Sequence, residues 1–468
     1  MNNLLEESKI EYSKLNFVDP VGRIFFKDNR VFRAITPEYL CLCREWFESG
    51  LIKELEEKKL IPKTTITDYK LKGYSLILEH EKIISTFPSE WCFSMIKDAT
   101  LALIEVNEIC NKYGFQIKDG HLWNIAFHLN KPVFLDLGSI VHFDKKVQGS
   151  FLSEFRETTI LPLILWSMNE DYFAQKLLEN PVTFYKWTLP SYRIWQSGFI
   201  KNVINKFLWS KFPIKSGYYL FRKIFTIIKG KNKYKCEDIL YKLVIKNIDK
   251  DFIKNKIKVP KSLSTMWKDY QTNCFNEIRE GNLNNQFKRF EKITQLIKGF
   301  SSDAQSITDI AGNMGGMLYY LEQNSDQFKQ LINLDYDETV VEKSYKQLKE
   351  LNSKVESYLM NLMLPKRDNI ADYLNSDVVL ALALTHHLLL TQNYKIDVIF
   401  NKIKSFSNKY VYIEFMPLGL WAGDDKNTPE LPNWYNTNWF RENFSKHFNI
   451  LHEEQLEKNR IMFVGTIK

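Results

Sequence analysis

The spacing of hydrophobic and polar positions divides the chain into three stretches, and the first, residues 1–150, begins with short alternating runs. "RIFFKDNRVFRAI" predicts a β-hairpin that turns at Asp28 and Asn29. "TITDYKLKGYSLILEH" predicts a second hairpin around Lys72 and Gly73. We therefore expect short strands at the start of this stretch.

Helices are predicted to follow each hairpin. "TPEYLCLCREWFESG" has Thr36 as its N-cap, Pro37 in its first turn and Gly50 at its end. "SEWCFSMIKDATLALIEVNEICNKYG" has helical spacing throughout and is predicted to end at Gly114. This mixture of strands and helices predicts an α+β domain over residues 1–150.

The second stretch, residues 151–300, has a helical pattern that several prolines interrupt. Its last predicted helix, "NNQFKRFEKITQLIKGF", is polar enough to serve as a connector. "SSD" at 301–303 then marks a domain boundary. We expect a helical extension that leads into a third domain.

The third stretch, residues 301–468, alternates predicted strands and helices and ends in a hairpin. Because strands that alternate with helices form parallel sheets with right-handed crossovers, this pattern predicts a doubly wound α/β domain with an antiparallel edge. Its ligand should lie at the carboxyl ends of the first strands, where the strand order reverses. The predicted strands are "SITDIA", "QLINLD", "VESYLMNL", "DVVLALAL" and "KYVYIEFM", and the hairpin is "FNILHEEQLEKNRIMFVGTIK".

The composition, with 44% hydrophobic and 26% charged residues, is typical of a globular protein of more than one domain at this length of 468 residues. No apolar run reaches the roughly 18 residues of a membrane span. The N-terminal residues lack the apolar stretch of a signal peptide. We expect a cytoplasmic protein whose six cysteines bind no structural metal and form no disulfide.

The net charge of +8 is spread unevenly. Residues 301–468 hold 17 Lys and Arg against 22 Asp and Glu, a net charge of −5, so residues 1–300 carry +13. Basic and aromatic side chains recur in 181–235, where no acid occurs. Such a segment is typical either of nucleic-acid or anionic-surface binding or, as we favour, of amphipathic helices with a solvated basic face.

A loop with small residues follows the first strand of the third stretch. In "ITDIAGNMGG", Asp309 ends the strand and Ala311, Gly312 and Gly315 precede a helix, so backbone N–H groups can approach a ligand closely. About 20 residues later, Asp335 ends the next strand, where a carboxylate can accept both hydroxyls of a ribose. This pair fits an adenosine cofactor.

The loop pattern D-x-A-G-N-x-G resembles the first motif of class I S-adenosylmethionine-dependent methyltransferases, with Ala311 in place of a glycine. An alanine at this position requires a backbone outside the positive-φ region. "SDVVLALALTHHLLLTQN" and "YVYIEFMPL" resemble later motifs of the same family. In order and spacing, these segments resemble a group of methyltransferases fused behind a kinase-like segment, including nodulation proteins of the NoeA type.

The resemblance implies a role for each residue that matches the methyltransferase motifs. The methionine end of S-adenosylmethionine would lie on Asp309, Gly312, Asn313 and Gly315, with Ala311 between them. Asp335 would hold the ribose. Asn361 falls where these enzymes often have an aspartate that faces the adenine amine, and its carbonyl can still accept that hydrogen bond.

His386 and His387 follow the strand that should carry the reacting groups. An imidazole with a pKa near 6.5 can remove a proton from a hydroxyl or an amine at neutral pH, so either residue is a candidate general base. The alternative is that one histidine packs structurally and the other bonds to a backbone carbonyl. Glu414 could assist the base, or it could be a buried acid that backbone N–H groups satisfy.

A second set of motifs lies in the first stretch. The spacing of Asp119, Asn124 and Asp136 resembles the catalytic loop and the D-F-G segment of kinases, in which Asp119 would orient a hydroxyl while Asn124 and Asp136 would hold Mg²⁺ and ATP. The expected glycine-rich loop is reduced to a single glycine. Arg33, with Glu45 as its candidate partner, stands in place of the usual lysine.

These observations favour a three-part protein: a kinase-like domain with a reduced first lobe (1–150), a helical extension (151–300) and a methyltransferase domain with a Rossmann-like sheet (301–468). We expect methyl transfer to a small-molecule, glycan or peptide acceptor, at oxygen or nitrogen. The alternatives are a kinase-like phosphotransferase, alone or as a second activity, and an RNA-binding methyltransferase that uses the basic segment 181–235.

Overall fold

The computed structural model describes residues 3–13, 19–167, 169–179, 250–260, 265–284, 287–367, 370–421, 423 and 429–468. These residues form two compact units, one made of Met1–Gln116, Leu122–His142 and Lys261–Lys468, and the other of Ile117–His121 and Phe143–Pro260. The basic segment 181–235 lies outside the described residues.

The first unit begins with an antiparallel five-stranded sheet of order β1-β2-β3-β5-β4. Both predicted hairpins are confirmed: β2 pairs with β3, and β4 pairs with β5. Asp28 and Asn29 have φ angles of 51° and 60°, the left-handed pair that a two-residue hairpin turn requires. The strands are β1 (Glu11–Tyr12), β2 (Gly22–Lys27), β3 (Arg30–Ile35), β4 (Thr64–Ile66) and β5 (Leu76–His80).

The helices next to this sheet begin and end close to their predicted limits. Thr36, however, is not an N-cap, because its hydroxyl donates to the Pro20 carbonyl (2.9 Å) instead of accepting a helix N–H. The helices are α1 (Leu40–Glu48), α2 (Leu51–Glu57) and α3 (Phe93–Lys112), and the short strands that follow are β6 (Phe115–Ile117), β7 (Ile125–His128), β8 (Lys131–Phe134) and β9 (Ile140–His142).

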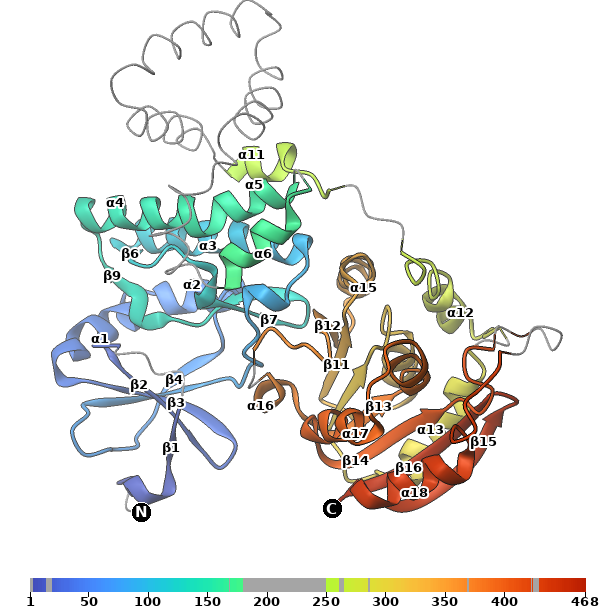
Figure 1. Cartoon of the computed structure of the whole chain (residues 1–468). Helices are drawn as coiled ribbons and strands as arrows, with labels where there is room; N and C mark the ends of the chain where they lie inside the picture. Colours follow the sequence, from blue (N-terminus) through green and yellow to red (C-terminus); the bar gives the residue numbers. More distant parts are fainter. Residues whose placement is uncertain are drawn as a thin grey trace, which may run out of the picture. The chain divides into compact units, whose positions relative to one another are not determined.

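The rest of the first unit is a seven-stranded sheet of order β12-β11-β10-β13-β14-β16-β15 (Figure 1). The first five strands in this order are parallel, and β14, β16 and β15 pair antiparallel, as predicted. This is the doubly wound, Rossmann-like sheet. Its strands are β10 (Ser306–Ile310), β11 (Gln330–Asp335), β12 (Val355–Leu359), β13 (Ser376–Ala381), β14 (Ser407–Phe415), β15 (Phe448–Glu457) and β16 (Arg460–Ile467).

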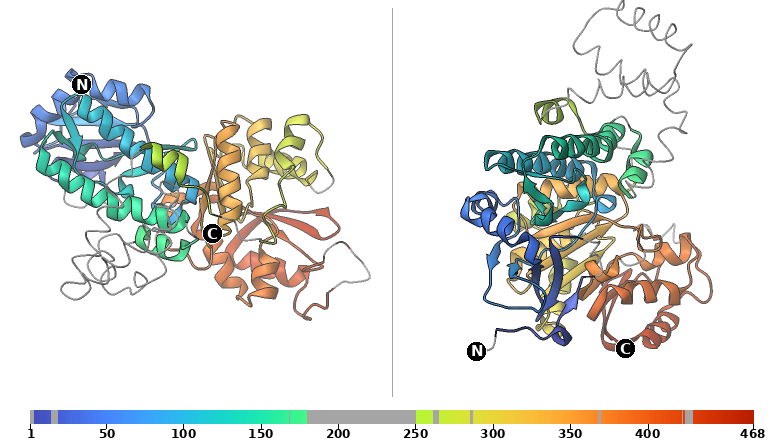
Figure 2. Two further views of the ribbon diagram at one scale, coloured as in Figure 1. Left: turned by 90° about the horizontal axis from the view of Figure 1, so that it is seen from above. Right: turned by 90° about the vertical axis from the view of Figure 1, so that its left-hand side faces the viewer.

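Helices cover both faces of this sheet (Figure 2). One face carries α12, α13, α14 and α15, and the other carries α17 and α18, where Phe440 packs against Phe415 and Phe463. The helices are α12 (Cys274–Glu280), α13 (Arg289–Phe300), α14 (Gly316–Asn324), α15 (Glu338–Glu350), α16 (Ala371–Leu374), α17 (Ile396–Ser405) and α18 (Thr437–His447).

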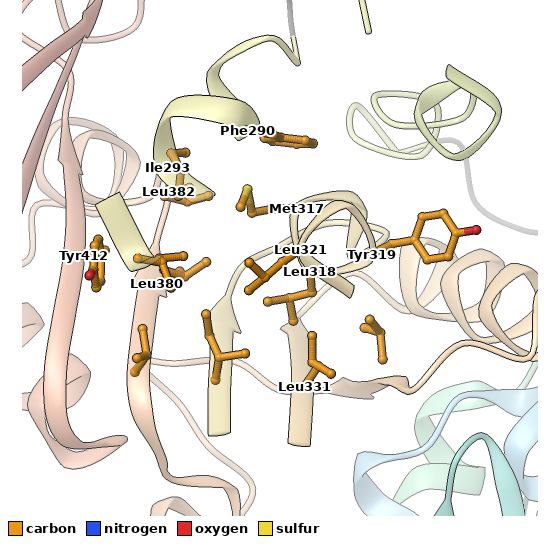
Figure 3. Close-up of a cluster of buried hydrophobic side chains, with 14 of the residues drawn as sticks. Phe290, Ile293, Met317, Leu318, Tyr319, Leu321, Leu331, Leu380, Leu382 and Tyr412 are labelled. Carbon is orange, nitrogen blue, oxygen red and sulfur yellow. The ribbon is translucent and has the colours of Figure 1, made fainter. Parts of the chain in front are cut away.

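The helix predicted as a polar connector, residues 284–300, is part of the core. Phe290 of α13 lies near Met317 of α14, and Ile293 of α13 lies beside Leu382, which follows β13 (Figure 3). Ile293 is fully buried. The connector interpretation was therefore wrong: most of the polar residues of this helix lie on an exposed face, opposite an apolar stripe that is buried. The predicted domain boundary at residue 301 falls between α13 and β10, which share this core.

The edge strand β12 contacts the N-terminal part of the same unit. The Asn130 side chain, in the turn between β7 and β8, donates to the carbonyls of Ser353 (3.1 Å) and Val355 (2.8 Å). Glu356 accepts the backbone N–H groups of that turn. We call these contacts the β12 seam. They pair groups that an open sheet edge would leave without partners.

The second unit is helical in the residues described. Gly120 is held between two of its side chains: its N–H donates to Glu154 (2.7 Å) and its carbonyl accepts from the Thr159 hydroxyl (2.9 Å). A Cβ at Gly120 would lie 2.6 Å from the Phe151 carbonyl, so only glycine fits. The elements are α4 (Lys145–Glu154), the π-helical turn Phe155–Ile160, α5 (Leu161–Ser167), α6 (Asp171–Glu179) and α11 (Lys250–Lys256).

Candidate functional site

The predicted methyltransferase residues gather at one edge of the seven-stranded sheet. Asp309, Asp335 and Glu414 lie at the carboxyl ends of β10, β11 and β14, and His386 follows β13. Because the chain crosses from β10 to β11 on one side and later returns to β13 on the other, this edge is where the strand order reverses. It is the position at which ligands bind in open α/β sheets.

The loop after β10 has an unusual backbone. Ala311, Asn313 and Gly315 have φ angles of 59°, 55° and 83°. The expectation that Ala311 avoids positive φ was therefore wrong, and this alanine adopts the conformation that a glycine would adopt at lower cost. Gly312 is required for space, since a Cβ there would lie 2.6 Å from the Asp309 Oδ2 atom. The loop thus lies directly on the carboxylate.

Asp309 is 1% exposed, and neither of its carboxylate oxygens has a hydrogen-bond partner. Burial, and then the neighbouring Glu414 and Asp335, raise its pKa well above the ordinary value, while Arg289 acts in the opposite direction. A buried acid without partners is costly, because burial removes its hydration and nothing replaces it. Asp309 therefore offers two acceptor atoms to a ligand cation at the loop.

Asp335 closes the same loop from the next strand. Its Oδ2 accepts the Asn313 N–H (2.9 Å) and its Oδ1 accepts the Asp337 N–H (2.9 Å). Burial raises the pKa of this carboxyl to about 6 although the two N–H groups act against the shift. The Tyr336 N–H also bonds to this carboxyl, but a carboxylate has about four lone-pair positions and can still accept a hydroxyl donor beside these groups. Tyr336, beside it, is 59% exposed and presents an aromatic face.

Three residues that the sequence motifs did not include also contact this loop. Gln271 bonds to the backbone at both ends of the loop. The Trp267 carbonyl accepts a hydrogen bond from the Asn313 side chain (3.1 Å). The Asn333 side chain donates to the Asn313 carbonyl (2.7 Å). Asn333 could have been noticed as a polar residue inside the apolar strand "QLINLD". Gln271 and Trp267 gave no local signal, because they precede the sheet by more than 30 residues.

The two histidines differ in their surroundings although their rings are 4.1 Å apart. His386 is 5% exposed, its Nδ1 has no partner, and burial lowers its pKa to about 3. His387 is half-buried, with a pKa that burial also lowers, and its ring packs edge-to-face on Trp267 (5.3 Å between centroids). Both imidazoles are neutral at pH 7, and His387 is the more accessible of the two.

Glu414 bonds to arginines and not to a histidine. Arg460 lies 2.7 Å from one carboxylate oxygen and Arg289 lies 3.6 Å from the other; Glu414 and Arg289 are buried, and Arg460 is partly buried. The prediction that Glu414 assists or orients a histidine has no support in these contacts. The other expectation is met in part: Glu414 is buried, but guanidinium groups and not backbone N–H groups face it, and its Oε1 has no hydrogen-bond partner.

Asn361 follows β12 and is exposed. Its Oδ1 accepts the N–H groups of Met363 (3.0 Å) and Leu364 (3.1 Å). The carbonyl that was expected to accept the adenine amine therefore has both lone pairs occupied. The amide nitrogen is the part of this side chain that remains to contact a ligand.

The groups at this edge of the sheet suit S-adenosylmethionine. The buried carboxylate, with two unsatisfied oxygens, provides a site for an ammonium group. The loop, in which Gly312 leaves no room for a side chain, allows a close backbone contact. The second carboxylate, on the next strand, provides a site for a ribose diol. The residues present fit the cofactor. They fit a dinucleotide less well, because the loop lacks the pattern that receives a pyrophosphate.

The kinase-like residues of the N-terminal part form different pairs from those expected. Arg33, buried in β3, contacts Asp19 (2.8 Å) and Asp136 (3.6 Å). Glu45 bonds to His142 (2.6 Å), so its predicted pairing with Arg33 was wrong. Gly138 of "DLG" packs on Arg33, because a Cβ there would lie 2.9 Å from the guanidinium. The predicted magnesium ligand Asp136 is thus close to a positive charge.

The two remaining kinase-like residues belong to different units. Asn124 is buried in the first unit and its Nδ2 has no hydrogen-bond partner. Asp119 is partly exposed and belongs to the second unit, next to the fixed Gly120. Phosphotransferase activity therefore stays a prediction.

Metal binding and membrane crossing find no support in the described residues. Among them, no group of three or more His, Cys, Asp or Glu side chains is arranged to hold a metal ion. No helix in this part of the chain has the length and apolar character to cross a membrane.

The proteins named here are similar to this chain at low identity. No family model matches the chain. Nodulation protein NoeA of Rhizobium meliloti (strain 1021) is 19% identical over 427 residues, which cover 86% of this chain and 84% of that protein. Both chains are therefore similar along most of their length, but an identity of 19% does not establish a common activity.

Among solved structures, the PH0226 protein from Pyrococcus horikoshii OT3 matches this chain with 15% identity and a TM-score of 0.34. The match covers 43% of this chain and 99% of the PH0226 chain. Magnesium protoporphyrin IX methyltransferase from Synechocystis PCC 6803, with bound SAH, covers 43% of this chain and 96% of its own, with 12% identity and a TM-score of 0.30. The strand order and directions described above define the fold more firmly than these scores.

Proposed function

We propose that this protein is an S-adenosylmethionine-dependent methyltransferase. The observation that carries the proposal is Asp309, a buried carboxylate with no hydrogen-bond partner for either oxygen. The loop after β10 can lie directly on this carboxylate because Gly312 has no side chain. Asp335 on the adjacent strand supports it as the acceptor of the ribose hydroxyls. Tyr336 supports it as a flat surface on which adenine can stack.

When bound, S-adenosylmethionine supplies a methyl group on a positively charged sulfur. The chain's own residues would then align the acceptor and remove its proton. We assign the base role to His387, because it is neutral and more accessible than its neighbour. A histidine as buried as His386, with a pKa of about 3, has too little proton affinity to deprotonate a hydroxyl and suits a positioning role better.

The acceptor we propose is a small molecule, a glycan or a peptide, methylated at oxygen or nitrogen. The phosphotransferase alternative is less favoured, since Arg33 already faces the Asp136 carboxylate that would have to bind Mg²⁺. The RNA-binding alternative depends on residues 181–235, outside the described part of the chain.

Calorimetric titration with S-adenosylmethionine tests the proposal. The wild type should bind, and Asp335→Ala should bind at least about tenfold more weakly, because the ribose loses two charge-assisted hydrogen bonds. Asp326→Ala, which removes an exposed acid of the same domain, should bind as the wild type does. A folded wild-type protein that shows no binding heat contradicts the proposed function.

A further inference from the structure

A segment that precedes the seven-stranded sheet holds the cofactor loop in place. Residues 265–274, which we call the pre-sheet segment, lead into α12. This segment reaches the loop through Gln271 and Trp267, and it is anchored on α15, where Lys343 donates to the Lys268 carbonyl (2.7 Å) and to Asp269 (2.7 Å). It is therefore fixed at both the loop and the neighbouring helix.

Gln271 joins the two ends of the loop through one amide group. Its Oε1 accepts the Gly316 N–H (2.9 Å) and its Nε2 donates to the Gly312 carbonyl (3.4 Å). The side chain is 5% exposed. The helix α14 begins at Gly316, and its N-cap, Gly315, has no side chain that could accept a helix N–H. Gln271 supplies this missing acceptor from outside the helix.

Trp267 links the same loop to the candidate base. Its carbonyl accepts the Asn313 side chain (3.1 Å), and its indole packs edge-to-face on His387 (5.3 Å between centroids). One residue of the pre-sheet segment thus touches both the predicted cofactor loop and the histidine that we assign to proton removal. A shift of the segment would move both.

We propose that Gln271 is a positioning residue that holds the loop of Gly312 to Gly316 in its cofactor-binding shape. The inference rests on the proposed function. An amide satisfies both ends, because it carries N–H donors as well as an acceptor oxygen, whereas a carboxylate carries acceptors alone. A carboxylate would also place a negative charge at the start of α14, where backbone N–H groups would otherwise favour an anionic part of the ligand.

The test compares ligand affinity among variants of the full chain, with S-adenosylhomocysteine as the probe in calorimetry. Gln271→Met keeps the length of the side chain and removes both hydrogen bonds, so it should weaken binding about tenfold or more while the melting temperature of the ligand-free protein falls by only a few degrees. Gln271→Glu should bind more weakly still. Thr272→Ala, at the exposed next position, should match the wild type.

Each outcome separates the inference from the proposed function. If the wild type binds and folded Gln271→Met binds within twofold of it, the positioning role is overturned while the proposed function stands. If the wild type itself does not bind, the proposed function fails and the inference fails with it. A loss of affinity in Gln271→Met that Thr272→Ala does not share supports the positioning role.

A second measurement follows the other end of the pre-sheet segment without any turnover. Trp267→Ala keeps the carbonyl that binds Asn313 but removes the ring that covers His387. The imidazole pKa of His387, followed by NMR titration, should rise toward its ordinary value, and S-adenosylhomocysteine affinity should change less than in Gln271→Met. An unchanged His387 pKa would overturn the link between the segment and the histidine.

Discussion

The loop after β10 concentrates backbone strain at single residues. Ala311 and Asn313 both adopt positive φ, a conformation that costs an L-residue with a Cβ roughly 1–2 kcal/mol. Such strain persists only where surrounding contacts fix it, and here Asp335, Gln271 and Asn333 each bond to the loop backbone or to a loop side chain. The sequence pattern located the loop correctly but could not reveal the φ of Ala311.

The strain predicts how position 311 responds to substitution. Ala311→Gly should change the free energy of unfolding by less than about 1 kcal/mol, because relief of the positive φ offsets the greater chain entropy of glycine in the unfolded state. Ala311→Val should lower it by roughly 2 kcal/mol, since a β-branched side chain tolerates positive φ poorly. Urea denaturation measures both, and equal stability of the two variants would contradict the observed backbone.

The histidine pair supports a second prediction at this scale. His387→Ala should lower the rate of methyl transfer about 10²–10⁴-fold with unchanged S-adenosylmethionine affinity, as expected when a general base is lost. His386→Ala should lower it much less. The rate of S-adenosylhomocysteine formation with an unmethylated acceptor measures both, and normal turnover by both variants would show that neither imidazole is the base.

At the scale of elements, strands were predicted better than helix ends or partners. β11 matches "QLINLD" over Gln330–Asp335 because a buried apolar run that ends in an acid has few alternatives. The function of α13 was misjudged because its polar face dominates its composition. Thr36 and Glu45 were misjudged because their partners, Pro20 and His142, come from other elements that local patterns do not contain. Gln271 escaped prediction for the same reason.

The buried face of α13 can be tested directly. Ile293→Ala should lower the free energy of unfolding by about 2–5 kcal/mol, since it leaves a cavity between the helix and the sheet. Gln295→Ala, on the exposed face of the same helix, should change it by less than about 0.5 kcal/mol. Equal effects in chemical denaturation would restore the connector interpretation.

At the scale of the whole molecule, the N-terminal part is joined to the sheet through buried polar contacts. Besides the β12 seam, Arg367 bonds to Glu90 (2.7 Å) and lies 3.8 Å above the Phe87 ring. Glu90 is 1% exposed, so loss of the arginine would leave an unpaired buried charge. None of these pairs could be inferred from sequence, because each joins residues hundreds of positions apart.

The β12 seam predicts how stability depends on pH. Burial raises the pKa of Glu356 from 4.5 to about 8. Because the folded state then binds a proton that the unfolded state has lost, stability falls as pH rises from about 4.5 to about 8. Between pH 7 and pH 8 this residue should reduce the free energy of unfolding by roughly 1 kcal/mol.

The measurement is chemical denaturation of the wild type and Glu356→Gln at several pH values. The amide that this substitution introduces cannot ionise. The difference in the free energy of unfolding between wild type and variant should therefore change by roughly 1 kcal/mol between pH 7 and pH 8. The interval lies above the range where the buried His80 and His386 contribute. Parallel curves would show that Glu356 is ionised throughout.

The β12 seam also orders events during synthesis. Chains emerge from the ribosome with the N-terminus first, so the turn at Asn130 is complete long before β12 has been made. Until Val355 has been synthesised, the donors of that turn have no strand to bind. Once β12 has paired with β11, the outer edge of β12 is open to other chains until the turn binds to it. The protein's yield on expression should therefore depend on how promptly its first and last parts meet.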